Sequence, residues 1–201
     1  MKRLLLPLLL CLCLLLPGCG KDRVERDFES FSARLNAAQS LRFTAKVRAE
    51  YEHKTARFTL AYEEDAEGGR VTVVAPELIR GVSARFAPGG TTLEYDSVVL
   101  DTGSLDSFGL SPMSSLPVLL HAMRVGHAES FWEEDGQTAA KLAPDDNLLC
   151  TVWFAKDPMR PVRAELVTDG RVTVVVEIND WQEGAALPVS PTPAAEMAEM
   201  E

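Results

Sequence analysis

Cys19 is the residue whose surroundings point most directly to chemistry. It follows Leu16-Pro17-Gly18 and stands at the end of an apolar run from Leu4 to Leu16, which the basic pair Lys2-Arg3 precedes. A run of this length is short for a transmembrane helix but suits the apolar region of a secretory signal. Because a cysteine thiolate is a good nucleophile, Cys19 can accept a covalent group during export.

This segment resembles a bacterial lipoprotein signal peptide. Cys19 takes the place of the lipobox cysteine, Gly18 that of the small residue before the cut, and Leu16 that of the apolar residue three before it. Pro17 departs from the usual Ala or Ser. The resemblance implies removal of residues 1–18 and a diacylglyceryl thioether on Cys19, with further acylation by a chain such as palmitate. The protein would then be anchored outside the cytoplasm, on the outer face of the plasma membrane or in an outer membrane. A plain secretory signal and an uncleaved anchor are the alternatives.

The histidines do not form a metal-binding pattern. The chain has three, His53, His121 and His127, and the last two are six residues apart without an HExxH frame. The carboxylate runs Glu63-Glu64-Asp65 and Glu133-Glu134-Asp135 both precede Gly-containing turns, which favours solvated loops over a calcium site or a catalytic pair. We therefore expect no metal and no cofactor.

Nucleophile and nucleotide motifs are missing as well. The sequence contains no GxSxG, GxGxxG or GxxxxGK[ST] segment. Ser111, Ser114 and Ser115 precede an apolar helical pattern and are typical of a helix start rather than of a nucleophile. The protein is therefore expected not to be an enzyme.

Composition narrows the function classes further. The 201 residues carry 20 Lys and Arg against 30 Asp and Glu, a net charge of −10, which argues against nucleic-acid binding. Cys11 and Cys13 fall in the signal, and Cys150 is then left without an internal disulfide partner. Its apolar neighbours indicate a buried small side chain.

The elements that must position any site are mostly strands. Val24, Phe28, Phe31, Leu35 and Ala38 lie on one face of a helix expected from about Asp22 to Ala38, after a short tether from Gly20. Alternating apolar and polar residues then predict a long strand over 41–51. Further strands are expected at 56–62, 70–75, 79–86, 91–95, 97–100, 129–133, 138–143, 148–155, 161–167 and 172–181. Gly-rich turns between them favour an antiparallel meander.

A helical insert interrupts the strands. Residues 112–127 show helical spacing of Met and Leu, with Pro112 near the start and Pro117 able to divide the segment into two short helices. From Gly184 the composition shifts to Ala, Pro and Glu, so residues 184–201 are expected to be a disordered acidic tail. The expected divisions are thus signal 1–18, domain 19–183 and tail 184–201. The fold class is mainly β (α+β): one curved antiparallel sheet or incomplete barrel of about 9–11 strands, covered by the two helical segments.

This order of elements resembles the lipoprotein-carrier superfamily, the LolA-like and LolB-like proteins. The features that carry the resemblance are the first helix, the long strand LRFTAKVRAEY, the step from Val71 to Glu77 across Pro76, the insert SPMSSLPVLLHAM, and the closing pattern from Asp157 to Ile178. The resemblance covers about residues 27–181. It implies a half-barrel whose apolar cavity accepts acyl chains or amphiphiles.

Two functions remain open at this point. In the first, the anchored half-barrel binds a lipid, a lipoprotein acyl chain or another amphiphile, and the helical stripe acts as a lid. The candidate cavity and lid residues are Met113, Leu116, Leu119, Leu120, Met123, Trp132 and Trp153. In the second, the same fold has a filled core and binds or senses an envelope protein.

Overall fold

The computed structural model describes residues 19–51, 54–96, 98–103, 110–125, 127–145 and 147–184. The expected signal at 1–18 lies outside the described residues. So does the expected tail, except for Gly184, which ends the last strand.

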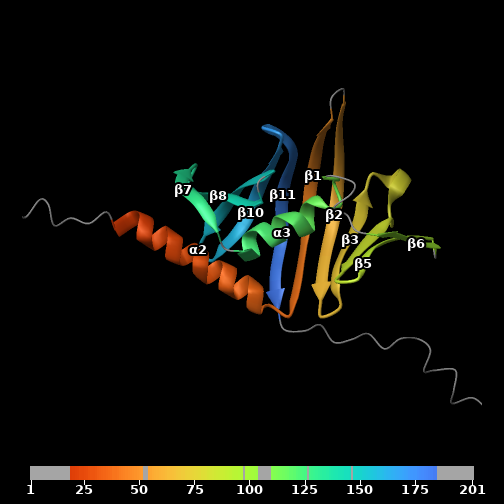
Figure 1. The fold of residues 1–201 in the computed structure, drawn as a ribbon, viewed down its shortest axis with the longest axis horizontal. Coiled ribbons are helices and arrows are strands. Elements are labelled where there is room, and N and C mark those ends of the chain that lie inside the picture. Colours follow the sequence, from red (N-terminus) through yellow and green to blue (C-terminus); the bar gives the residue numbers. More distant parts are fainter. Residues whose placement is uncertain are drawn as a thin grey trace, which may run out of the picture.

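Two α-helices, one short 3₁₀ helix and eleven strands make up the described chain (Figure 1). Their bounds are α2 Cys19–Ala37, β1 Ser40–Tyr51, β2 Lys54–Asp65, β3 Gly68–Ala75, η1 Glu77–Ile79, β4 Ser83–Ala87, β5 Gly90–Tyr95, β6 Val98–Gly103, α3 Ser115–Val125, β7 Ala128–Glu134, β8 Gln137–Asp145, β9 Leu148–Lys156, β10 Met159–Thr168 and β11 Arg171–Gly184.

All eleven strands form one antiparallel sheet in the order β6-β5-β4-β3-β2-β1-β11-β10-β9-β8-β7. Each half is a meander of neighbouring hairpins, and the halves meet where β1 pairs with β11, with Val47 opposite Val176. The predicted fold class is therefore confirmed. The edges of the open sheet are β6 and β7.

Local sequence explains the hairpins. Asp135-Gly136 joins β7 to β8, and Asp169-Gly170 joins β10 to β11. All four residues have positive φ, which the favoured two-residue hairpin turns require and which Asp and Gly tolerate best. These turns set the register of the β7–β8 and β10–β11 hairpins.

The two faces of the sheet differ. Alternate residues of β1, from Leu41 to Ala49, are buried on what we call the inner face, and those between them point to the outer face. Helices α2 and α3 contact the inner face over β7, β8 and β10, and Figure 1 shows both on the same side of the sheet. The core lies between these helices and the sheet.

Three local expectations were wrong. The strand expected at 79–86 begins only at Ser83, because η1 and the positive-φ residue Gly81 turn the chain after Pro76. No tether separates Cys19 from the helix, since α2 starts at Cys19 itself. Pro117 does not divide the insert: it lies in the first turn of α3, where its missing N–H has no helical acceptor to lose.

Candidate functional site

The apolar stripe of α3 is packed rather than open. Three serines form the helix start: Ser114 Oγ accepts from the Ser111 N–H at 2.8 Å, and the Ser115 N–H donates to the Ser111 carbonyl at 3.0 Å. The expected lid residues Leu116, Leu119, Leu120 and Met123 are at most 1% exposed, and Met113, in the turn before the helix, is half-buried. All five belong to or pack against the core cluster.

Aromatic side chains fill the neighbouring part of the inner face. Phe28 and Phe31 of α2 both meet the ring of Phe154 edge-on, with centroids 5.7 and 5.2 Å apart. Trp181 stacks on Phe43 at 5.1 Å and also lies beside Phe31. Such rings bury large apolar areas, so α2 closes this part of the sheet.

A polar network fixes α3 against the sheet. Glu64 of β2 accepts from Arg124 Nη2 at 2.7 Å and from the Tyr62 hydroxyl at 2.6 Å. The Arg124 carbonyl also accepts from Asn36 of α2 at 2.9 Å and from Ser32 at 3.2 Å. Burial, together with the hydrogen bond to Glu64, raises the pKa of Tyr62, so it stays a donor at any physiological pH. The end of α3 is therefore tied to both α2 and β2.

Trp132 and Trp153 lie elsewhere. In the register of β7, β8 and β9 both stand opposite Ala139, on the outer face, whereas the α3 stripe lies on the inner face. Their indole N–H groups donate to the same Glu134 carboxylate oxygen, at 3.1 and 3.0 Å, and these bonds lower the pKa of Glu134. The Arg163 guanidinium covers Trp153, 4.5 Å from its ring centroid. The fold thus does not bring the two tryptophans together with α3.

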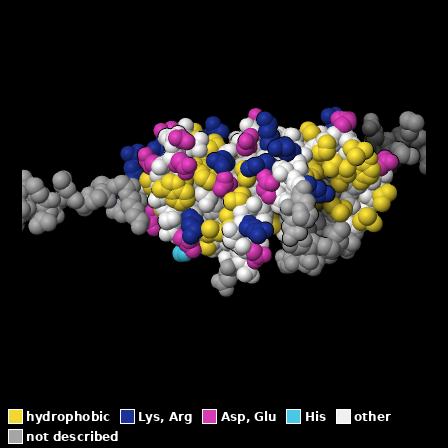
Figure 2. Space-filling view, turned by 90° about the horizontal axis from the view of Figure 1, so that it is seen from above, with side chains coloured by type: hydrophobic (Ala, Val, Ile, Leu, Met, Phe, Trp, Pro, Cys, Tyr) yellow, Lys and Arg dark blue, Asp and Glu magenta, His cyan; other side chains and the backbone are white. Residues whose placement is uncertain are grey.

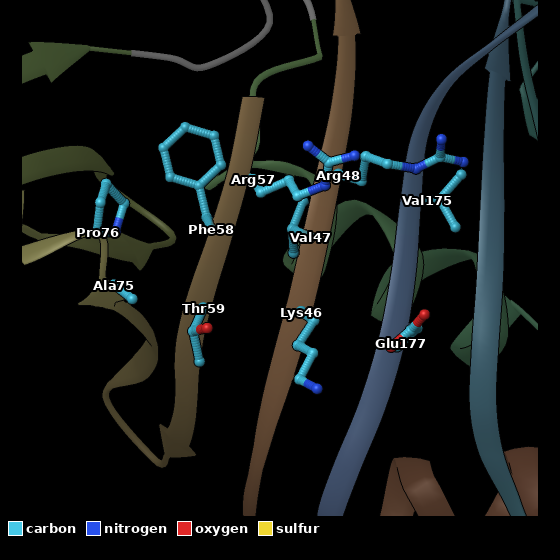
Figure 3. A pocket seen from close by; sticks show the side chains of 10 residues that line it. All are labelled: Lys46, Val47, Arg48, Arg57, Phe58, Thr59, Ala75, Pro76, Val175 and Glu177. Atoms are coloured by element: carbon cyan, nitrogen blue, oxygen red, sulfur yellow. The ribbon is translucent and has the colours of Figure 1, made fainter. Parts of the chain in front are cut away.

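Four cavities lined by described residues lie away from α3. One of about 470 Å³ opens on the outer face over β1, β2 and β11 (Figure 3). Figure 3 shows the charged side chains of Lys46, Arg48, Arg57 and Glu177 among those that line this cavity. Three others lie at strand ends and beside the start of α2. None of these four is lined by a residue of the α3 stripe.

The inner face stays apolar beyond the helices. The register aligns one row of residues across β2 to β6: Tyr62, Val71, Ala84, Leu93 and Leu100. Val98 stands opposite Tyr95 on the same face. Tyr95, Val98, Val99 and Leu100 are nevertheless each more than half exposed. We call these four residues the β6-edge surface. Figure 2 shows hydrophobic side chains gathered at the end of the molecule where Figure 1 places β5 and β6.

The β6-edge surface is the feature that sequence reasoning missed. The pattern indicated strands at 91–95 and 97–100 but not their exposure. A signal was present: Val98-Val99-Leu100 is apolar on both faces, which is unusual in an exposed edge strand.

The described residues offer little for covalent or metal chemistry. No group of three His, Cys, Asp or Glu side chains among them is placed to hold a metal ion. Burial, and to a smaller extent Asp145, raises the pKa of the Cys150 thiol to about 12, so it is not a reactive thiolate. Neither α2 nor α3 is long and apolar enough to cross a membrane.

Several solved structures are similar to this chain. The chain is similar to a LolA superfamily protein of Nitrosomonas europaea, with 12% identity over 80% of this chain and 94% of the other and a TM-score of 0.43. It is also similar to the lipoprotein LppX of Mycobacterium tuberculosis, with 14% identity, 84% and 98% coverage and a TM-score of 0.40. A structure of the Clostridioides difficile amidase CwlD in complex with the lipoprotein GerS matches with 14% identity, 79% and 94% coverage and a TM-score of 0.42.

All three structures are distant from this chain in sequence. No protein-family model and no curated protein sequence matches the chain.

Proposed function

We propose that this protein is a non-catalytic, lipid-anchored module that binds a protein partner at the surface of the cell envelope. The observation that carries the proposal is the packing of the α3 stripe, which is at most 1% exposed at Leu116, Leu119, Leu120 and Met123 and belongs to the core cluster. An acyl-chain site of the usual kind would need a cavity of roughly 300 Å³ or more beneath it.

The position of Cys19 supports attachment close to the membrane. Cys19 is the first residue of α2, and Phe28, nine residues later, is already buried in the core. At 1.5 Å per residue this separates the anchor from the core by about 14 Å. Two or three acyl chains on Cys19 would hold the domain against the bilayer, where it meets partners confined to the same surface.

The amphiphile-binding function that the sequence also predicts is the alternative, and one experiment separates the two. The detergent-extracted full-length protein is examined by native mass spectrometry and titrated with a fluorescent fatty acid, beside Leu120→Ala and Leu116→Ala. A filled core predicts no retained lipid other than the chains on Cys19, no saturable binding, and a loss of about 2–5 kcal/mol in each variant. A bound lipid whose occupancy changes in the variants, with little loss of stability, would establish the alternative.

A further inference from the structure

The two edges of the sheet are not alike. Edge strand β7 carries Glu129, Glu133 and Glu134, two of which form ion pairs with lysines of β8 and β9, and it also contacts α2. Charges of this kind discourage a further strand from pairing. Edge strand β6 begins with Val98-Val99-Leu100, and these three side chains are about 60% exposed. The β6 edge has fewer charges, with Asp101 as the one ionisable residue of the strand.

The backbone of β6 is oriented for pairing at Val99. The β5–β6 hairpin has a two-residue loop between Tyr95 and Val98. In such a hairpin the residues flanking the loop exchange hydrogen bonds, and the next pair, here Glu94 and Val99, does not. The N–H and carbonyl of Val99 therefore point toward the open edge, away from β5.

We propose that the β6-edge surface is an interface between two copies of this chain, an inference that rests on the proposed function and names its partner. The two β6 strands pair antiparallel about a two-fold axis at Val99, which exchanges both backbone hydrogen bonds with its own copy. Val98 of each copy then lies opposite Leu100 of the other on the inner face, beside Tyr95. The two sheets become one.

The sequence around the axis is self-complementary, which favours a second copy over an unrelated strand. A two-fold interface must present the same surface from both sides. When the axis passes through Val99, the three apolar residues of one copy face the same three residues of the other. A shift of one residue would place Val98 and Leu100 opposite side chains of the other face.

Charged residues flank the apolar run rather than interrupt it. Glu94 of β5 stands opposite Val99 in the register, and Asp96 and Asp101 lie on either side of the run in the sequence. The Glu94 carboxylate is 2.6 Å from Arg70 Nη1 and is therefore neutralised. The β6-edge surface itself contains no ionisable group except the Tyr95 phenol. The axis at Val99 is therefore apolar, and acidic residues of the two copies meet only at the ends of the run.

The interface is small, so it requires the membrane anchor. At roughly 60–100 Å² for each of the four exposed side chains, two copies would bury about 500–800 Å² of apolar surface in addition to the paired backbone. Stable complexes in solution bury about 1,200–2,000 Å². Confinement on one membrane raises the effective concentration and compensates for the difference.

Disulfide trapping tests both the partner and the register. Full-length Val98→Cys and Leu100→Cys proteins with different epitope tags are expressed in the same cells, and their membranes are treated with a mild oxidant. The directly opposed positions 98 and 100 are within disulfide range, whereas two copies of position 98 lie about 8 Å apart. We expect a mixed-tag dimer at least about tenfold above that from either variant alone.

Val172→Cys is the matched control, because it is an exposed valine of the same sheet far from β6 and reports chance collisions. Adding Val99→Asp should reduce the mixed dimer about tenfold, while Val74→Asp, an exposed valine of β3, should not. Equal yields from single and mixed variants, no disulfide although both thiols react with maleimide, or cross-linking only to another protein would each overturn the second-copy interface.

The two proposals can fail separately. If no disulfide dimer forms and the chain retains no lipid beyond that on Cys19, the β6 pairing is contradicted and the interaction function is not. Trapped dimers in which each chain retains a lipid contradict the filled-core function and leave the pairing standing.

Discussion

Arg124, in the last turn of α3, donates from Nη2 to Glu64 Oε1 of β2 at 2.7 Å, across 60 positions of sequence. The two side chains are 27% and 21% exposed, so the pair is largely shielded from water. Of the ion pairs between described residues, this one joins the helical insert to the first half of the sheet. This contact helps to hold the end of α3 against the sheet.

Removing Arg124 should therefore weaken the fold. Arg124→Met leaves Glu64 as a half-buried carboxylate bonded only to Tyr62, and we expect a loss of about 1–3 kcal/mol in urea unfolding. Combining it with Glu64→Gln should recover part of the loss, because the unpaired charge disappears. Arg80→Met, which breaks an exposed pair with Glu77, is the control and should change stability by less than about 0.5 kcal/mol. Equal effects of the two arginine variants would contradict a structural role for Arg124.

A substitution at Gly69 of β3 tests the position of Tyr62, the other side chain that binds Glu64. A Cβ at this position would be 2.4 Å from the Tyr62 hydroxyl oxygen, so Gly69→Ala must displace Tyr62 or β3. We expect a loss of about 1–3 kcal/mol, reduced when Tyr62→Phe removes the clashing oxygen. Gly89→Ala, where a Cβ meets nothing within 4 Å, is the matched control. Thermal melts of the four proteins suffice, and an unrelieved loss in the double variant would show that the strain lies in the backbone.

The buried thiol of Cys150 should make the fold less stable at alkaline pH. Burial raises the pKa of its thiol from an ordinary 9.0 to about 12. Below pH 9 both the folded and the unfolded chain hold this proton, and the contribution is fully present. Between pH 9 and about 12 only the folded chain holds it, so stability falls as the pH rises, by up to about 1.4 kcal/mol per pH unit.

The variant Cys150→Ala should lose this dependence. Its free energy of unfolding is expected to run parallel to that of the wild type below pH 9 and to decline less steeply above it, apart from a constant offset for the cavity. Urea titrations at pH 7, 8, 9.5 and 10.5 measure both slopes. Identical slopes above pH 9 would mean that the thiol is accessible to water in the folded chain.

Anchoring is tested at Cys19. Cys19→Ser should abolish incorporation of labelled palmitate and leave the precursor unprocessed, because the thiol is the acceptor of the diacylglyceryl group. Cys150→Ala, which keeps Cys19, is the control and should incorporate label as the wild type does. Label in the Cys19→Ser protein, or none in the wild type, would contradict the lipoprotein assignment.

Local sequence alone determined most of the secondary structure. The alternation from Leu41 to Tyr51 made β1 a half-buried strand, and Asp169-Gly170 made the last hairpin, because both patterns act through neighbouring residues. The helical spacing of Phe28, Phe31 and Leu35 likewise predicted α2 and its buried face. The same is true of the meander within each half of the sheet.

Only the tertiary structure decided what covers each face. The stripe of α3 could have been exposed or buried, and Trp132 could have lain on either face of the sheet, because periodicity does not state what lies opposite a side chain. Helices over β7 to β10 bury Leu120, while β6 lies beyond their reach and leaves Leu100 exposed. Burial follows from contacts between distant segments, here the pairing of β1 with β11 and the docking of α3, which no local pattern encodes.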